Sequence, residues 1–196
     1  MTDLLTVINH PLFNAISIFI IKYFTKDISS DDPSALSYIR QGYLISQAIN
    51  LGLHYLLIYI IRKKNDQTSL KYVEPGRTSW NGTKTADQLI NTTFTEYDVL
   101  DTKQSIKQCF TSIAMVVFIH LQFHFLLPLI IQPIMSFKTF LTSKQAQIHL
   151  WGRNTNHGDL KRPFRLMSPF GTALPENQQP RVDRGSIKKV EKSKNN

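Results

Sequence analysis

The chain has a single cysteine, Cys109, among its 196 residues. One thiol excludes a disulfide framework within the chain and a cysteine-rich zinc site. The sequence also lacks a glycine-rich phosphate loop, a nucleophile elbow and a helical HExxH motif. We therefore predict a protein that is not an enzyme and that has no catalytic residues, no cofactor and no bound metal.

Acidic residues are scarce: 14 Asp and Glu stand against 23 Lys and Arg, which gives a net charge of +9. This excess predicts acidic partners, such as RNA, anionic lipid or an acidic protein surface. The three longest apolar runs contain no Asp or Glu at all. Their absence disfavours a proton-coupled transporter, which would use carboxylates inside the membrane.

Three apolar runs approach the roughly 20 residues that cross a hydrocarbon core of about 30 Å. They cover residues 4–23, 43–61 and 109–131. Soluble core helices would show a polar face at every turn, so these runs predict an all-α integral membrane protein with about three transmembrane helices. The first run has no basic start and no cleavage site, so we expect a retained segment and not a signal peptide. Segment 137–150 is amphipathic and predicts an interfacial or partial fourth helix, which completes a membrane domain over residues 1–150.

The rest of the sequence is polar. Residues 65–104 are rich in Thr, Asn, Asp and Gly and predict a largely irregular loop, with sequons at Asn81 and Asn91 that matter only in the lumen. Asp101 predicts the N-cap of the following helix. Residues 151–196 carry ten Lys and Arg against four acids and predict a basic tail, disordered over about its last 15 residues.

Polar residues follow one face of the second apolar run. At 100° per residue they fall within an arc of about 80°. They are Arg40, Tyr43, Gln47, Asn50 and His54. Because polar groups that face lipid are costly, we expect this stripe to face inward. Two interpretations remain open: hydrogen bonds between helices, or a hydrophilic groove open to one side of the bilayer.

His120 and His124 lie four residues apart in the third run, which is a suitable helical spacing for two metal ligands. No carboxylate lies nearby in sequence and no cysteine pair completes a tetrahedral set. We therefore interpret both histidines as polar positions within a membrane span, paired with the stripe on residues 40–54. Pro128 and Pro133 predict the place where this span ends or bends.

Several short motifs occur in order between about residue 30 and residue 171. They are Asp32-Pro33, Tyr38-Ile39-Arg40, LKYVEPG at 70–76, Tyr97-Asp98, IHLWG at 148–152, GDLKRPF at 158–164 and Phe170-Gly171. The ordered set resembles the fungal endoplasmic-reticulum membrane family first named for inorganic phosphate transport. That family is better known as the third component of the SRP-independent targeting route.

The resemblance implies a multi-pass protein of the endoplasmic reticulum that helps to place membrane proteins in the bilayer. Its implied partners are the Sec translocon with its other subunits, the translating ribosome and its rRNA, nascent membrane-protein clients and lipids of the endoplasmic reticulum. On this interpretation the groove candidates are Arg40, Gln47, Asn50, His54, His120 and His124. The candidates for docking to ribosome or lipid are Lys161, Arg162 and Arg165. The alternatives are phosphate transport or the maturation of phosphate transporters, and a purely structural scaffold in a translocon.

The topology stays open at this point. Lys192 and Lys194 resemble a dilysine retrieval signal, and with the basic tail they predict a cytosolic C-terminus. Three full spans then place loop 65–104 in the lumen. A fourth, partial span over 128–150 would place the loop in the cytosol instead.

Overall fold

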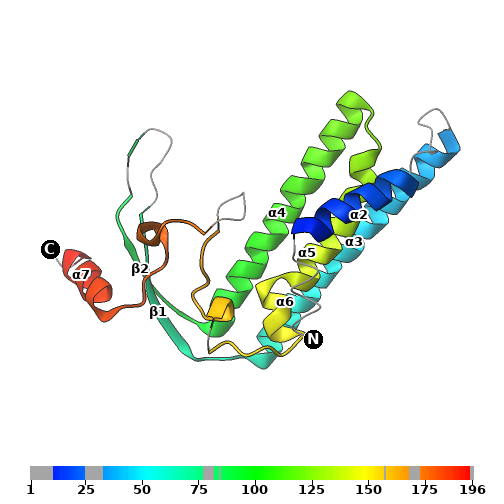
Figure 1. Cartoon of the computed structure of the whole chain (residues 1–196). Coiled ribbons are helices and arrows are strands. Elements are labelled where there is room, and N and C mark those ends of the chain that lie inside the picture. The colour runs from blue at the N-terminus through cyan, green and yellow to red at the C-terminus, as the bar shows by residue number, and fades with distance from the viewer. Residues whose placement is uncertain are drawn as a thin grey trace. The chain divides into compact units, whose positions relative to one another are not determined.

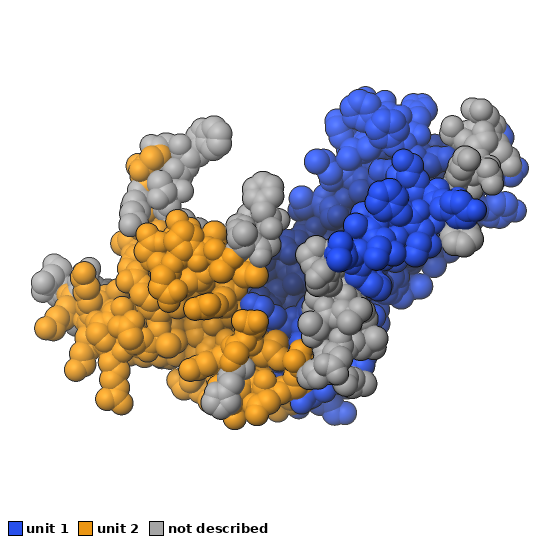
Figure 2. Space-filling view, in the orientation of Figure 1, with its two compact units in different colours: residues 1–63, 99–152 blue, residues 64–98, 153–196 orange. Residues whose placement is uncertain are grey.

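The computed structural model describes residues 11–24, 33–76, 82–83, 85–156, 158–167 and 173–194. The chain divides into two compact units, which Figure 2 colours separately. Unit 1 comprises residues 1–63 and 99–152, and unit 2 comprises residues 64–98 and 153–196. The sequence predicted one division near residue 150, whereas in the structure residues 64–98 pack with the tail. The predicted span over 4–23 lies partly outside the described residues.

Unit 1 is built from helices (Figure 1). They are α2 (Pro11–Phe24), α3 (Pro33–Lys64), α4 (Phe94–Phe123), α5 (Leu127–Thr142) and α6 (Lys144–His149), of which α4 begins in unit 2. By length and composition, α3 and α4 can each cross a membrane, and α2 and α5 contain shorter apolar stretches. The mainly helical class is confirmed, with two candidate spans where the sequence predicted about three.

The predicted span over 109–131 is wrong at its C-terminal end, because two helices share it. α4 ends at Phe123, and His124 follows with φ +57°. Pro128 occupies the first turn of α5, where the missing N–H of proline costs no helical hydrogen bond. The chain therefore turns between α4 and α5, close to the position that Pro128 predicted.

The exposure pattern of unit 1 is the reverse of that of a soluble domain. Asn50 on α3 is only 1% exposed, while Leu44 on the same helix is 61% exposed. Large apolar side chains are exposed along α2, α3 and α4, and buried polar residues lie among the helices. Soluble monomers rarely expose apolar surface on this scale, whereas a bilayer favours it. This pattern supports the membrane interpretation.

Unit 2 contains a two-stranded antiparallel sheet of β1 (Ser69–Glu74) and β2 (Gln88–Thr93), with Ser69 opposite Thr93. Arg181 extends the sheet, because Val73 N–H donates to the Arg181 carbonyl at 2.8 Å and Arg181 N–H returns a bond at 3.0 Å. The expectation of a largely irregular loop over 65–104 is wrong in these strands. Short strands rich in Thr and Asn carry a weak sequence signal, and their pairing depends on the distant tail.

Asp101 is not the N-cap of the next helix, because α4 already begins at Phe94. Thr93 Oγ1 accepts the N–H of Glu96 at 3.3 Å, and Glu96 is the third residue after it. This Thr-x-x-Glu spacing is a capping-box signature that the sequence contained. Asp101 lies inside α4, about two turns after its first residue, Phe94, and accepts a bond from Gln145 Nε2 at 3.1 Å.

The tail is more ordered than the sequence predicted. It contains two short 3₁₀ turns, at Gly158–Leu160 and Glu176–Gln178, and the helix α7 (Arg184–Lys194). The expectation of disorder is wrong over α7, because Asp183 caps this helix by accepting the N–H of Ser186 at 2.7 Å. The half-buried Ile187 and Val190 share one face of α7, which lies against β1 and β2.

Candidate functional site

A line of polar residues on α3, α4 and α5 forms the first candidate site, which we call the polar row. It consists of Arg40, Tyr43, Gln47, Asn50 and His54 on α3, Cys109, Ser112 and His120 on α4, and Gln132 on α5. Tyr43, Gln47, Asn50 and His54 are all buried, which confirms that the α3 stripe faces inward. Arg40 is exposed at one end of the row.

Arg40 and His120 meet at that end of the row. Arg40 Nε donates to His120 Nε2 at 3.1 Å. The other ring nitrogen of His120, Nδ1, lies 3.0 Å from the carbonyl of Phe125. Because Nε2 accepts the bond from Arg40, the proton belongs on Nδ1, and His120 is a neutral imidazole that donates to Phe125. The imidazole thus fixes the direction of the Arg40 side chain.

A second contact joins three helices. The Tyr43 hydroxyl donates to Gln132 Oε1 at 2.5 Å, and Gln132 Nε2 donates to Ser112 Oγ at 2.9 Å. These bonds are what the helix-contact interpretation of the stripe predicts. The candidate residues chosen from the sequence did not include Gln132 or Ser112. Each is a polar residue within an apolar run, and this is the signal that could have identified them.

Gln47 and Asn50 differ from Tyr43, Gln132 and Ser112 in their hydrogen bonding. They are 4% and 1% exposed. Gln47 Nε2 and both side-chain polar atoms of Asn50 are buried, and the described part of the chain offers them no hydrogen-bond partner. A buried amide without a partner costs about 1–3 kcal/mol, so the protein maintains an energetically unfavourable polar interior here. Groups of this kind can bind a polar group that arrives from elsewhere.

His54 continues the row past Asn50. Its Nδ1 lies 2.9 Å from the Asn50 carbonyl, and its ring packs against Phe140 with centroids 4.8 Å apart. With the proton on Nδ1, Nε2 can accept from the Cys109 thiol, whose sulfur lies 4.0 Å away. Within the described ranges, no group of three or more His, Cys, Asp or Glu side chains could hold a metal ion.

His124 does not join the row, although the sequence grouped it with His120. It follows the last residue of α4, is exposed, and has left-handed backbone angles. The predicted spacing of four residues needs a continuous helix, and the helix ends at Phe123. The pair therefore cannot act as two ligands from adjacent turns of one helix.

Among the predicted docking residues, Arg162 is the one that the structure places in the interior of unit 2. It is 8% exposed, and its guanidinium makes two bonds to the Asp98 carboxylate, at 2.7 Å and 2.5 Å. The guanidinium also lies 4.6 Å from the centre of the Phe94 ring. A cation enclosed in this way cannot reach an external phosphate. The assignment of Arg162 to docking is therefore wrong.

Lys161 and Arg165 remain on the surface of unit 2. Both line a cavity of about 460 Å³, and Lys161 is exposed. Arg165 makes a loose ion pair with Glu176, at 3.8 Å between Nη2 and Oε2. Exposed pairs of this kind contribute about 1 kcal/mol or less, so Arg165 can exchange Glu176 for another anion at little cost.

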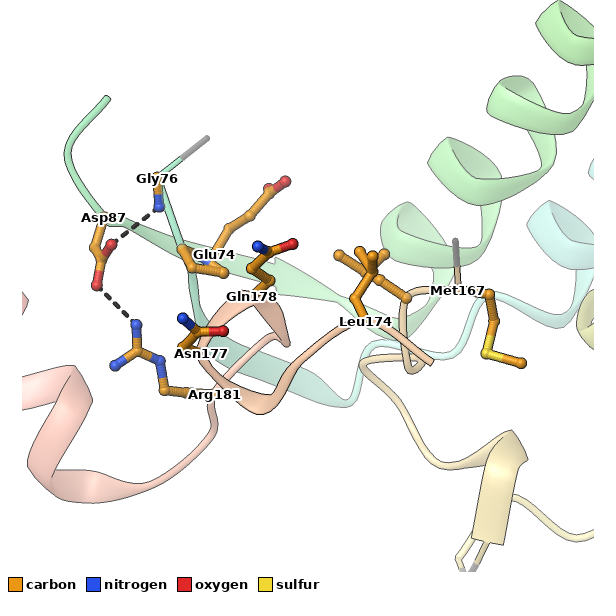
Figure 3. A pocket seen from close by; sticks show the side chains of 10 residues that line it. Glu74, Gly76, Asp87, Met167, Leu174, Asn177, Gln178 and Arg181 are labelled. Atoms are coloured by element: carbon orange, nitrogen blue, oxygen red, sulfur yellow. Dashed lines mark hydrogen bonds and ion pairs between the residues drawn. The ribbon is translucent and has the colours of Figure 1, made fainter. Parts of the chain in front are cut away.

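A larger cavity of about 700 Å³ lies beside the sheet of unit 2 (Figure 3). Asp87 is one of its lining residues: one carboxylate oxygen accepts the N–H of Gly76 at 2.9 Å, and the other accepts Arg181 Nη2 at 3.0 Å. Glu74 also lines the cavity. Asp87 and Glu74 thus place two carboxylates in a cavity lined by one arginine, Arg181. Asp87 already neutralises this arginine, so the cavity is a poor site for phosphate.

The outward apolar surface and the inward polar row define a helical, membrane-associated protein with a polar interior. The chain belongs to the Pho88 family, described as phosphate transport, which it matches over residues 8–196. This confirms the resemblance seen in the sequence motifs.

Two curated relatives align over nearly the whole chain. SRP-independent targeting protein 3 of Saccharomyces cerevisiae is 34% identical over 192 residues, which cover 95% of this chain and 96% of the relative. The SRP-independent targeting protein 3 homolog of Schizosaccharomyces pombe is 30% identical over 187 residues, which cover 93% and 94%. No solved structure matches the chain.

Proposed function

We propose that this protein is a membrane factor of the endoplasmic reticulum that serves SRP-independent targeting and helps client helices to enter the bilayer. It would act beside the Sec translocon and the translating ribosome. The names of the two yeast relatives, and their alignment over nearly the full chain, support the targeting role. The observation that carries the insertion role is that Gln47 Nε2 and both side-chain polar atoms of Asn50 are buried with no hydrogen-bond partner among the described residues.

The proposed mechanism is a lower desolvation cost. A client segment that enters lipid must bring along polar groups, each of which costs several kcal/mol when unpaired in hydrocarbon. The polar row would act as the hydrophilic groove and offer hydrogen bonds to these groups during passage. A pure scaffold would be expected to satisfy its buried amides internally, as Tyr43, Gln132 and Ser112 do. Gln47 and Asn50 therefore favour the groove over the scaffold.

Unit 2 supports one of the two topologies. Residues of the 65–104 segment bond to residues of the tail through Asp98 and Arg162 and through Val73 and Arg181. Because they are in direct contact, the 65–104 segment and the tail lie on the same side of the bilayer. The chain must therefore cross the bilayer an even number of times between these two segments. We propose that α4 crosses and α5 returns. At 1.5 Å per residue, the 16 residues of α5 reach about 24 Å, which suits the partial fourth span. With a cytosolic C-terminus, all of unit 2 would be cytosolic.

The exposed cations of unit 2 are the proposed contacts to the ribosome or to anionic lipid. Lys161 and Arg165 keep this role. On α7, Arg184, Lys188 and Lys192 recur every four residues and are exposed. Closely spaced cations suit the phosphates of RNA or lipid.

The test of the insertion role is a triple variant, Gln47→Leu, Asn50→Leu and His54→Phe. The matched control changes the lipid-facing side of the same helix: Leu44→Ala, Ile49→Ala and Leu56→Ala. The first variant should reduce insertion of client proteins in cells that depend on this chain, while its own abundance stays unchanged. The control should leave insertion unchanged. Normal insertion with the first variant would contradict the groove.

Phosphate transport is the second candidate, because the family description names it. The arginines Arg162 and Arg181 are already paired with carboxylates, which gives a direct phosphate site little support. Purified protein in liposomes should therefore not move radiolabelled phosphate. Phosphate uptake by liposomes with the protein, but not by empty liposomes, would support phosphate transport as the function in place of the insertion role.

A further inference from the structure

Arg40 is a positioned cation at one end of the polar row, and the described residues use few of its hydrogen-bond donors. The bond to His120 uses one of the five N–H donors of its guanidinium. The residue is exposed, and its direction is set by the neutral His120 ring, which is itself held by the Phe125 carbonyl. Arginine prefers planar, two-pronged contacts with carboxylates, and the remaining donors suit such a contact.

The described helices around Arg40 offer it no carboxylate. Asp101 is the single acidic residue in the ranges 33–63 and 99–152. It already accepts a bond from Gln145, and it precedes His120 by 19 residues of α4, which is about 28 Å along the helix axis. The Arg40 charge is therefore not neutralised by the described parts of unit 1.

The position of Arg40 along α3 matches a membrane boundary. Arg62 lies 22 residues further along the same helix, which is about 33 Å, close to the thickness of the hydrocarbon core. The polar row runs inward from Arg40 to His54 over 14 residues, or about 21 Å. A polar path of this length has one fixed charge, and that charge lies at its end opposite Arg62.

From this arrangement we propose that Arg40, positioned by His120, makes the polar row selective for client segments with an acidic flank. The inference rests on the proposed insertion function. In the proposed topology Arg40 lies at the lumenal end of the row, so a client carboxylate that passes along the row would gain a charged partner there, which offsets its desolvation cost. A client lysine would meet a like charge at the same place and would be disfavoured. Arg40 would therefore determine specificity, and His120 would act as a positioning residue.

The experiment uses one client helix with three short flanks that differ only in charge: four Asp, four Asn or four Lys. Insertion is measured by protease protection in membranes that contain the full-length protein, and in membranes without it. The wild type should insert the Asp client best and the Lys client least. Arg40→Gln should lower the ratio of Asp to Asn client insertion about fivefold, the effect expected for one partly exposed ion pair. Arg40→Lys should restore part of the ratio, and Arg62→Gln, at the other end of α3, should leave it unchanged.

The outcomes separate the inference from the function on which it rests. Equal loss for all three clients in Arg40→Gln would overturn the charge selectivity and leave the insertion role standing. Asn client insertion that does not depend on the protein at all would overturn the insertion role and the inference with it. Because Arg40→Gln could act through misfolding, each variant is compared at equal abundance. His120→Gln should then reduce the Asp to Asn ratio, but less than Arg40→Gln does.

Discussion

The guanidinium of Arg162 and the carboxylate of Asp98 form two short hydrogen bonds in the interior of unit 2, although 64 residues separate them in the sequence. Their side chains are 4% and 1% exposed. The pair joins the first turns of α4 to the tail, which are two parts of the chain that hydropathy alone would assign to separate domains.

Breaking this pair should destabilise unit 2 strongly. Arg162→Met removes the arginine that neutralises the buried Asp98 carboxylate, and the expected cost is about 3–5 kcal/mol. Pulse proteolysis of the detergent-solubilised protein, with denaturant increased stepwise, measures the loss. The double variant Asp98→Leu with Arg162→Met should be more stable than the single variant, because no buried charge remains. A single variant as stable as the wild type would contradict the buried pair.

The two sequons of unit 2 should carry no glycan. Asn91 lies in β2, and its strand is paired with β1 in the unit that also contains the tail. If the tail is cytosolic, Asn81 and Asn91 are cytosolic as well. Endoglycosidase treatment should leave the electrophoretic mobility of the protein unchanged, while a lumenal glycoprotein in the same extract shifts. A shift that disappears in Asn91→Gln would place unit 2 in the lumen.

The stability of unit 2 should depend on pH through Asp66. The Thr68 side chain, at 2.6 Å, and then the Thr68 backbone N–H, at 3.0 Å, donate to this carboxylate and lower its pKa. A lowered folded-state pKa means that the stabilisation is present above the unfolded value near 3.8 and is lost as pH falls through the folded value.

Asp66→Asn keeps an acceptor for Thr68 but removes the titration. The difference in unfolding free energy between this variant and the wild type should therefore stay constant well above pH 3.8 and shrink as the pH falls below that value. It should amount to no more than about 1 kcal/mol at neutral pH, because water screens this largely exposed group. A difference that grows on acidification would contradict the assignment.

Attachment of α7 should depend on its apolar face and not on its surface ion pair. Ile187 and Val190 are half-buried, whereas Lys71 and Glu191 make an ion pair at 2.5 Å with side chains that are about two-fifths exposed. Glu191→Gln should cost about 0.5 kcal/mol. Ile187→Ser with Val190→Ser should release the helix and expose residues 184–194 to limited proteolysis. If Glu191→Gln exposed α7 to proteolysis and the double serine variant did not, the ion pair and not the apolar face would hold α7 in place.

The sequence predicted the parts of the fold that local patterns control. The stripe from Tyr43 to His54 is a property of one helix, so its period indicated the buried face correctly. The start of α4 also follows from a local pattern, the Thr93 and Glu96 capping box. This pattern was missed because the polar composition of residues 65–104 favoured an irregular loop. The sequence could not indicate that Asp98 meets Arg162, because no local pattern connects residues so far apart.

The same distinction explains the errors at the candidate site. Lys161 and Arg162 are adjacent basic residues, and composition alone could not show that Arg162 is buried while Lys161 is exposed. Gln132 joins the polar row only because α5 folds back against α3 and α4. Long-range packing decided both cases.

His120 and His124 should respond in opposite ways to substitution. His120→Leu removes the acceptor for Arg40 and leaves the Phe125 carbonyl without its donor, so it should lower stability by about 1–3 kcal/mol. His124→Gly should be neutral or stabilising by up to about 1 kcal/mol, because the left-handed backbone at φ +57° is strained for a residue with a Cβ. Thermal unfolding of the solubilised variants measures both effects, and added zinc should shift neither midpoint. The end of α4 at Phe123 argues against His120 and His124 as a pair of metal ligands. If His120→Leu and His124→Gly were equally destabilising and zinc stabilised the wild type, that interpretation would be supported instead.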